Sequence, residues 1–136
     1  MGGLESKKCI PCEGGIPALS EIQFTPLLTE VNGWKVIDNH HLYKVYEFKD
    51  FQDALDYVNK IGLISEEEGH HPDISLSWGK VGIKIYTHKI DGLHENDFIL
   101  AAKFDEAYIW EMIFYIFVSN SFIVSINEYV KEAILS

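Results

Sequence analysis

The stretch EEEGHHPDISLSWGKVGIKIYTH, residues 66–88, decides the fold because it joins the end of a helix to two strands. Gly69 is a natural helix stop, and Pro72 prevents the helix from continuing. Apolar and polar residues then alternate over residues 73–78 and again over residues 81–86, with a Gly-Lys pair as a turn between them. This pattern predicts an antiparallel hairpin that directly follows a helix.

The rest of the main part of the chain shows the same kinds of pattern. Two segments rich in aromatic and β-branched residues, 34–38 and 42–48, predict a first hairpin. Apolar residues at helical spacing and capping residues predict three helices, over residues 21–30, between Asp50 and Gly69, and over residues 95–104. The order helix, two strands, helix, two strands, helix predicts an α+β fold, in which a four-stranded antiparallel sheet carries the helices on one face.

Length and charge restrict the possible functions. The chain has 136 residues, within the roughly 100–150 residues typical of one compact domain. Its 21 acidic and 11 basic residues give a net charge of -10, which would repel a phosphate backbone or an anionic lipid surface. We therefore expect no nucleic acid and no membrane among its partners. The N-terminal residues 1–9 lack the apolar stretch of a secretory signal, so we expect the protein to be cytoplasmic.

The C-terminal residues 105–136 differ in composition, since 20 of these 32 residues are hydrophobic. Their uninterrupted apolar runs are much shorter than the roughly 18 residues of a membrane span, because Glu111 and the polar residues 119–121 break them. We expect a buried extension of the last helix, or a helical hairpin that turns at residues 119–121. The chain then divides into a leader, a main domain and a hydrophobic, aromatic-rich extension, over residues 1–19, 20–104 and 105–136.

Histidines are the most prominent candidates for chemistry, and four of the six lie between residues 70 and 94. His70 and His71 enter the third strand and His88 leaves the fourth, so antiparallel pairing brings the three together. Imidazoles titrate near neutral pH and can supply both an acid and a base. Two alternatives stay open: zinc ligation, although adjacent side chains on an extended segment point to opposite faces, and ordinary polar residues at strand ends. The last alternative suits His40 and His41 best.

The two cysteines, Cys9 and Cys12, form a single C-x-x-C pair in a leader rich in Pro and Gly. One such pair supplies half of a four-ligand zinc site and lacks the strand-to-helix context of a thioredoxin-type redox motif. We interpret them as reduced thiols in a segment without regular structure.

Three separated motifs stand in a fixed order: Glu-Glu-Glu-Gly-His-His-Pro-Asp at residues 66–73, Tyr-Thr-His at 86–88 and Gly-Leu-His-Glu-Asn-Asp-Phe at 92–98. The leader adds a C-x-x-C-x-G-G-x-P-x-L pattern at residues 9–19. Together they resemble the signature of the pterin-4a-carbinolamine dehydratases, over about residues 8–104.

The resemblance implies a lyase that needs neither cofactor nor metal. Such an enzyme removes water from 4a-hydroxytetrahydrobiopterin, left by an aromatic amino acid hydroxylase, and gives quinonoid dihydropterin. The reaction needs an acid at the leaving hydroxyl and a base near N5 of the ring. His70, His71 and His88 match the family's three active-site histidines. We expect His70 or His88 to protonate the hydroxyl and His71 to handle the N5 proton.

The resemblance also implies which residues bind the pterin and which support the histidines. The family binds pterin along two segments, which here contain His70, His71, Pro72, Thr87, His88, Lys89 and Ile90. Asp97 and Glu66 match acidic positions that could orient an imidazole, although simple solvation of a helix explains Glu66 nearly as well. His94 stands where the family usually has Ser or Thr as a helix cap, which predicts a cap weaker by about 1 kcal/mol and adds a fourth titrating group.

The family also suggests partners and an alternative role. Exposed sheet edges and the family's dimers and tetramers predict a homodimer or homotetramer. Members of the family also act as dimerisation partners of a transcription factor, or as assembly factors that have lost the active site. A non-catalytic binding module on the same scaffold is therefore the alternative, although retention of all three histidines favours catalysis.

Overall fold

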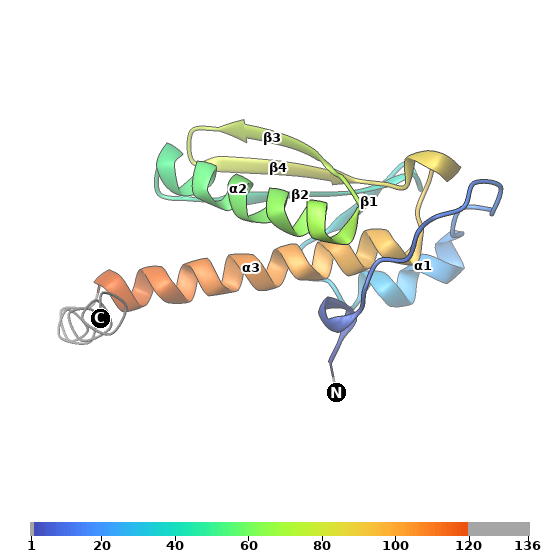
Figure 1. Cartoon of the computed structure of the whole chain (residues 1–136), viewed down its shortest axis with the longest axis horizontal. Helices are drawn as coiled ribbons and strands as arrows, with labels where there is room; N and C mark the ends of the chain where they lie inside the picture. The colour runs from blue at the N-terminus through green and yellow to red at the C-terminus, as the bar shows by residue number, and fades with distance from the viewer. Residues whose placement is uncertain (1, 120–136) are drawn as a thin grey trace.

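Within residues 2–119, which the computed structural model describes, the two predicted hairpins form one four-stranded antiparallel sheet with α-helices on one face (Figure 1). The strands are β1 (Lys35–Ile37), β2 (His41–Glu47), β3 (Asp73–Ser77) and β4 (Lys80–Ile85). The α-helices are α1 (Glu21–Leu28), α2 (Phe51–Glu68) and α3 (Glu95–Ser119), and the 3-10 helices are η1 (Leu4–Ser6) and η2 (His88–Ile90). The predicted α+β class and the order of its elements are confirmed.

The strand order is β1-β2-β4-β3, so β4 lies inside the sheet and β3 at its edge. Lys84 of β4 is paired with Asp73 of β3 on one side and with Tyr43 of β2 on the other. This register puts the start of β3 and the end of β4 at the same end of the sheet, beside the start of α3 (Figure 1). The segments that carry the predicted site residues meet at this end.

Local signals set the ends of the helices close to their predicted positions. An Asp50 carboxylate oxygen accepts a hydrogen bond from the Asp53 N–H at 2.8 Å and caps α2. Gly69 ends α2 in the left-handed conformation, with a φ of 64° that suits glycine. Helix α1 ends two residues before the predicted position, because the Glu30 N–H donates to the carbonyl of Leu27, three residues back, in a closing turn.

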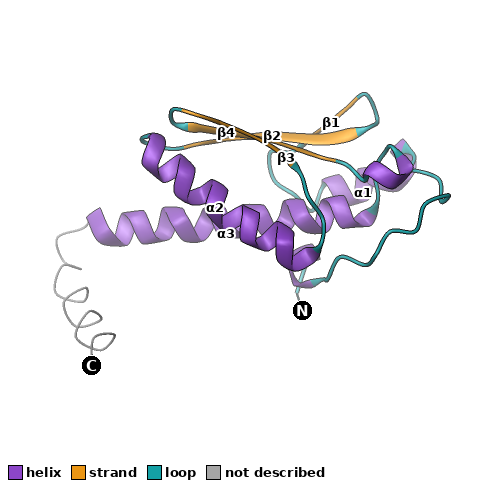
Figure 2. Cartoon of the chain, turned by 45° about the horizontal axis from the view of Figure 1, so that its top comes forward, coloured by secondary structure: helices purple, strands orange, loops and turns teal. Residues whose placement is uncertain are grey.

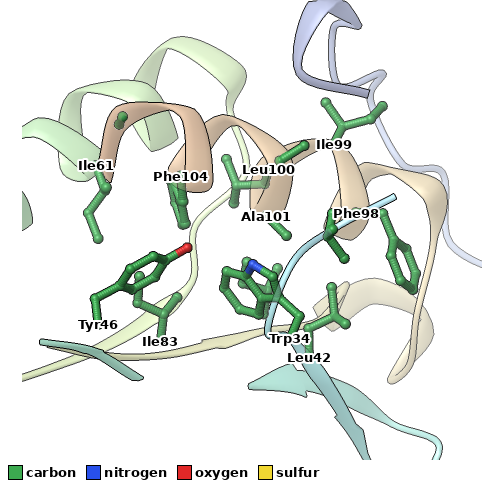
Figure 3. Close-up of a cluster of buried hydrophobic side chains, with 14 of the residues drawn as sticks. Trp34, Leu42, Tyr46, Ile61, Ile83, Phe98, Ile99, Leu100, Ala101 and Phe104 are labelled. Atoms are coloured by element: carbon green, nitrogen blue, oxygen red, sulfur yellow. The ribbon is translucent and has the colours of Figure 1, made fainter. Parts of the chain in front are cut away.

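The core lies between the sheet and the helices α2 and α3 (Figure 3). Buried side chains from both layers fill it, among them Leu42, Tyr46, Ile61, Ile83, Phe98 and Phe104. The hydroxyl of Tyr57 on α2 donates to the Phe104 carbonyl on α3 at 2.8 Å and joins the two helices. This packing fixes the first turns of α3 against the sheet, where the site residues lie.

Helix α3 is much longer than the predicted helix over residues 95–104. It continues to Ser119, and its far end projects beyond the sheet (Figures 1 and 2). Ala107 and Tyr108 still pack on the core, but the apolar side chains between residues 109 and 118 are largely exposed. The predicted burial of this extension is therefore wrong for these residues within the single chain, because the sheet and α2 leave most of their apolar side chains uncovered.

The alternative prediction, a helical hairpin turning at residues 119–121, lies largely outside the described residues. Ser119 is still helical, and residues 120 and 121 are not described. Among the described helices, none is long and apolar enough to cross a membrane.

Candidate active site

The three predicted histidines line one cavity of about 370 Å³ at the meeting point of β3, β4 and α3. His70 and His71 come from the connection between α2 and β3, and His88 is the first residue of η2. The full lining is Cys9, Ile10, Pro11, Cys12, Glu68, Gly69, His70, His71, Thr87, His88, Lys89 and Asn96. The structure thus places at one cavity the groups that the hairpin geometry predicts to be neighbours.

His70 is held by a buried carboxylate. Its Nε2 lies 2.6 Å from Oδ1 of Asp97, whose side chain is fully buried in the first turn of α3. The other oxygen, Oδ2, accepts hydrogen bonds from the Thr87 hydroxyl at 2.9 Å and from the His94 N–H at 2.8 Å. These donors satisfy the carboxylate and fix its position. With the Nε2–H of His70 donating to Asp97, Nδ1 is the ring nitrogen that remains for a substrate.

His71 has a partner of a different kind. Its Nε2 lies 2.5 Å from Oε1 of Glu66, but the two side chains are 59% and 76% exposed. Exposed pairs of this type contribute little to stability because water screens them. The adjacent histidines therefore differ: His70 is anchored in the protein, whereas His71 stands at the solvent-facing side of the cavity.

His88 is positioned by aromatic packing. Its ring lies 4.2 Å from that of Tyr86, between ring centroids, and Tyr86 in turn packs on His40 at 4.6 Å. Nε2 of His40 lies 2.8 Å from Oδ1 of Asp91, the residue that closes η2. Within residues 2–119, no hydrogen bond reaches the His88 ring from another side chain. Tilted ring packing on Tyr86 thus supports this histidine.

The prediction that His40 is an ordinary turn residue is incomplete. The pairing of Leu42 with Ile85 continues the β2–β4 ladder and brings His40 beside Tyr86, a relation that depends on non-local register. His41 lies next to it, with the two Nδ1 atoms 3.1 Å apart. Burial, then Lys84 and His40, lower the pKa of His41 below its usual value.

Not every predicted binding residue reaches the cavity. Thr87 and Lys89 line it, and Thr87 also supports Asp97. Pro72 and Ile90 are not part of the lining, although they belong to the two connections that carry the histidines. Asp97 lies behind His70, and Glu66 reaches only His71.

His94 takes over the capping role that Ser or Thr usually has in the family. Its Nδ1 accepts the Asn96 N–H at 3.1 Å, while its own N–H donates to Asp97. This reciprocal arrangement resembles a capping box and offsets the predicted weakness of the cap. His94 does not line the cavity, so it adds no fourth titrating group there.

The leader is the part of the site that sequence reasoning missed. Four consecutive residues, 9–12, line the cavity together with Glu68, Gly69 and Asn96. The available signal was the C-x-x-C-x-G-G-x-P-x-L pattern, but no periodicity indicates where an irregular segment packs. Both cysteines are free, and the described part of the chain holds no group of three or more His, Cys, Asp or Glu side chains placed to bind a metal ion.

Comparisons with known proteins agree with the geometry. The family model described as "Pterin 4 alpha carbinolamine dehydratase" matches residues 17–107. Two proteins, each named "Putative pterin-4-alpha-carbinolamine dehydratase", are similar to this chain. The one from Rubrobacter xylanophilus is 48% identical over 105 residues, covering 77% of this chain and 98% of that protein. The one from Alkaliphilus metalliredigens is 52% identical over 107 residues, covering 78% and 96%.

A solved structure supports the same assignment. The crystal structure of a transcriptional coactivator/pterin dehydratase from Brucella melitensis superposes with a TM-score of 0.63 at 26% identity. The match covers 66% of this chain and 97% of that one. The chain therefore belongs to the pterin-4a-carbinolamine dehydratase family.

Proposed function

We propose that the protein is a 4a-hydroxytetrahydrobiopterin dehydratase that works by histidine acid–base catalysis. The observation that carries the proposal is the meeting of His70, His71 and His88 at one cavity, with His70 held by the buried Asp97. Family membership supports the substrate class, because relatives that align over nearly their whole length carry the dehydratase name.

The reaction needs two proton transfers at different atoms of the pterin. A base removes the N5 proton, and the N5 electron pair forms the C4a=N5 double bond. The C4a–O bond breaks, and a proton from an acid turns the leaving hydroxyl into water. Proton, oxygen and electron pair are all accounted for without an oxidant, so imidazoles suffice.

The environments of the histidines suggest a division of roles. Asp97 holds His70 in one orientation, so its Nδ1 can exchange a proton at a fixed position, as protonation of the leaving hydroxyl requires. His71 and its partner Glu66 face solvent, so a proton taken from N5 can pass on to water. His88, whose ring packs on Tyr86, is the second candidate for the acid. Backbone groups of residues 70–72 and 87–90 bind the edge of the pterin.

The experiment follows the absorbance of 4a-hydroxytetrahydrobiopterin with purified protein. Wild type should accelerate its loss well above the rate in buffer, and His70→Ala, His71→Ala and His88→Ala should each lower kcat by about 100-fold. His41→Gln is the matched control, because this ring lies outside the cavity lining and the variant should retain activity. If the wild-type protein gives the same rate as buffer alone, the proposed enzymatic function is wrong. The alternative, a non-catalytic binding module on the same scaffold, would then be favoured.

The proposal includes self-association and a cytoplasmic setting. The edge strand β3 and the exposed apolar side chains of α3 between residues 109 and 118 are surfaces that a second copy can cover. The substrate places the enzyme after an aromatic amino acid hydroxylase, which generates the 4a-hydroxypterin. Light scattering of the purified chain measures the assembly directly.

A further inference from the structure

The leader segment, residues 9–12, forms part of the cavity although it lies outside the region that matches the family model. That match begins at residue 17, yet four of the twelve lining residues come from the leader segment. Figure 1 shows the leader in blue, crossing the start of α3. The cavity is therefore incomplete without residues that lie outside the family-model match.

A buried side chain holds the centre of this segment. The Ile10 N–H donates to Oδ1 of Asn96 at 3.0 Å, and Nδ2 of Asn96 donates to the Ile10 carbonyl at 2.7 Å. Asn96 is only 3% exposed, so its side chain is held in the protein, and its bonds to the exposed Ile10 are partly shielded from water. The Asn96 carboxamide thus binds both the N–H and the carbonyl of Ile10. These two bonds fix the orientation of the backbone at Ile10 as well as its distance from α3.

A second anchor lies one residue earlier. The Cys9 N–H donates to Oε2 of Glu68 at 2.8 Å, and Oε1 of Glu68 lies 3.3 Å from Nζ of Lys103. The Cys9 thiol itself lies 3.6 Å from the Asn96 carbonyl, and burial, followed by the charge of Glu68, raises its pKa to about 12. Cys9 is therefore a packed, protonated thiol at neutral pH.

Both anchors belong to the segments that position His70. Asn96 directly precedes Asp97, the carboxylate that binds His70. Glu68 is the last residue of α2, two residues before His70. The leader segment is consequently fastened to the same framework as the candidate catalytic group, while Ile10 keeps a side chain that is 62% exposed at the cavity.

From this arrangement we propose that residues 9–12 are a substrate-binding wall that covers the flat, heteroaromatic pterin ring and sets its affinity. The inference rests on the proposed function for the identity of the ligand. Ile10 and Pro11 offer apolar surface to a ring face, and the histidines that line the same cavity supply the polar groups. The wall binds and does not transfer protons, so its loss raises KM and leaves kcat nearly unchanged.

Asn96→Ala removes the two hydrogen bonds that hold the backbone of Ile10. Lys7→Ala is the matched control. Lys7 also tethers the leader, to Glu95 at 2.7 Å, but it is exposed and does not line the cavity. The probe is biopterin, a stable pterin that does not undergo the reaction, with its fluorescence as the binding signal. We expect Asn96→Ala to weaken biopterin binding and raise KM by about tenfold with kcat within about twofold, and Lys7→Ala to change neither by more than about twofold.

Thiol alkylation gives a readout that does not depend on turnover. In a Cys12→Ser background, Cys9 should react with iodoacetamide about tenfold faster once Asn96 is replaced by Ala, and biopterin should slow the reaction when Asn96 is present. If Asn96→Ala exposes Cys9 while biopterin affinity stays the same, the wall proposal is wrong. The wild-type protein could also lack dehydratase activity while its affinity for biopterin still falls on replacement of Asn96. That result would overturn the proposed function, but it would support the role of residues 9–12 in pterin binding.

A second variant covers the case in which Asn96→Ala fails to fold. Ile10→Ser changes an exposed side chain, so the fold and the alkylation rate of Cys9 should be preserved. Biopterin binding should nevertheless weaken by about threefold, because apolar cover over the ring is lost. Unchanged affinity in this folded variant would overturn the proposal.

Discussion

At the scale of single residues, the two carboxylates beside the adjacent histidines have unequal surroundings. Asp97 is fully buried and binds His70, Thr87 and the His94 backbone, whereas the carboxylate of Glu66 is exposed and binds His71. A buried charge-assisted hydrogen bond is stronger than one that water screens. The buried carboxylate should therefore matter far more for the geometry of the site.

Asp97→Asn tests this difference. The amide can present an N–H where the carboxylate accepts, so we expect loss of the His70 orientation, a fall in kcat of about 10- to 100-fold and a loss of about 1–3 kcal/mol in unfolding free energy. The matched change Glu66→Gln should alter both quantities only slightly. Steady-state kinetics and urea denaturation measure them, and equal effects of the two substitutions would contradict the assignment.

Asp105 is a second carboxylate with several hydrogen-bond donors around it, but it does not line the cavity and its role is structural. Its carboxylate accepts from the Trp34 indole at 3.1 Å, the Tyr46 hydroxyl at 2.5 Å and the Lys44 ammonium at 2.6 Å. Replacing it by Ala removes the acceptor of these three donors and of the Asn32 N–H, which donates to Oδ2 at 3.3 Å. We expect Asp105→Ala to reduce the unfolding free energy by about 3 kcal/mol with kcat unchanged at a temperature where the protein is folded. The exposed neighbour, Glu106→Ala, is the control, and a similar small effect of both changes would be inconsistent with this role.

At the scale of elements, periodicity predicts the sheet and the three helices because each buries one apolar face. The convergence of His70, His71 and His88 also follows, since it needs only the β3–β4 hairpin. The packing of His40 on Tyr86 requires the β2–β4 register, which no local pattern encodes. The leader lacks regular structure, so its packing on the cavity has no periodic signal.

The attachment of the leader to α2 predicts a dependence on pH. Burial alone would raise the pKa of Glu68, but the Cys9 N–H and Lys103 outweigh burial and lower it below the ordinary 4.5. The stabilisation by Glu68 is then complete above about pH 4.5 and is lost as the pH falls through the lowered value. In urea denaturation, the stability difference between wild type and Glu68→Gln should be largest near neutral pH and shrink as the pH falls below 4.5. A difference that does not change with pH would show that the charge of Glu68 is not involved.

At the scale of the whole molecule, the packed body ends near Tyr108, which contacts Phe48 and Tyr57 across the core. Beyond it, Glu111 still pairs with Lys60 at 2.8 Å, and the apolar side chains from Ile113 to Val118 are exposed. The exposure of these side chains could not be predicted from the sequence. Apolar residues on every face of a helix indicate that the helix is buried, but they do not indicate which surface covers it.

Truncation after Glu111 tests the role of the extension. The shortened chain keeps the core and the Lys60 pair, so its melting temperature per protomer and its cavity should be preserved. If the extension holds copies together, light scattering should report a smaller assembly than for the full chain. Phe114→Ser in the full-length chain is the companion variant, with the same expected direction, and an unchanged mass for both would rule out association through α3.

The contact between Ile10 and Asn96 joins residues that are 86 positions apart. Chains are synthesised from the N-terminus, so Ile10 leaves the ribosome long before its partner exists. The wall of the cavity can close only after the first turn of α3 has been made and has docked on the sheet. The leader segment is thus synthesised first but is among the last parts of the chain to reach its final position. A complete cavity therefore forms only when the rest of the fold has formed.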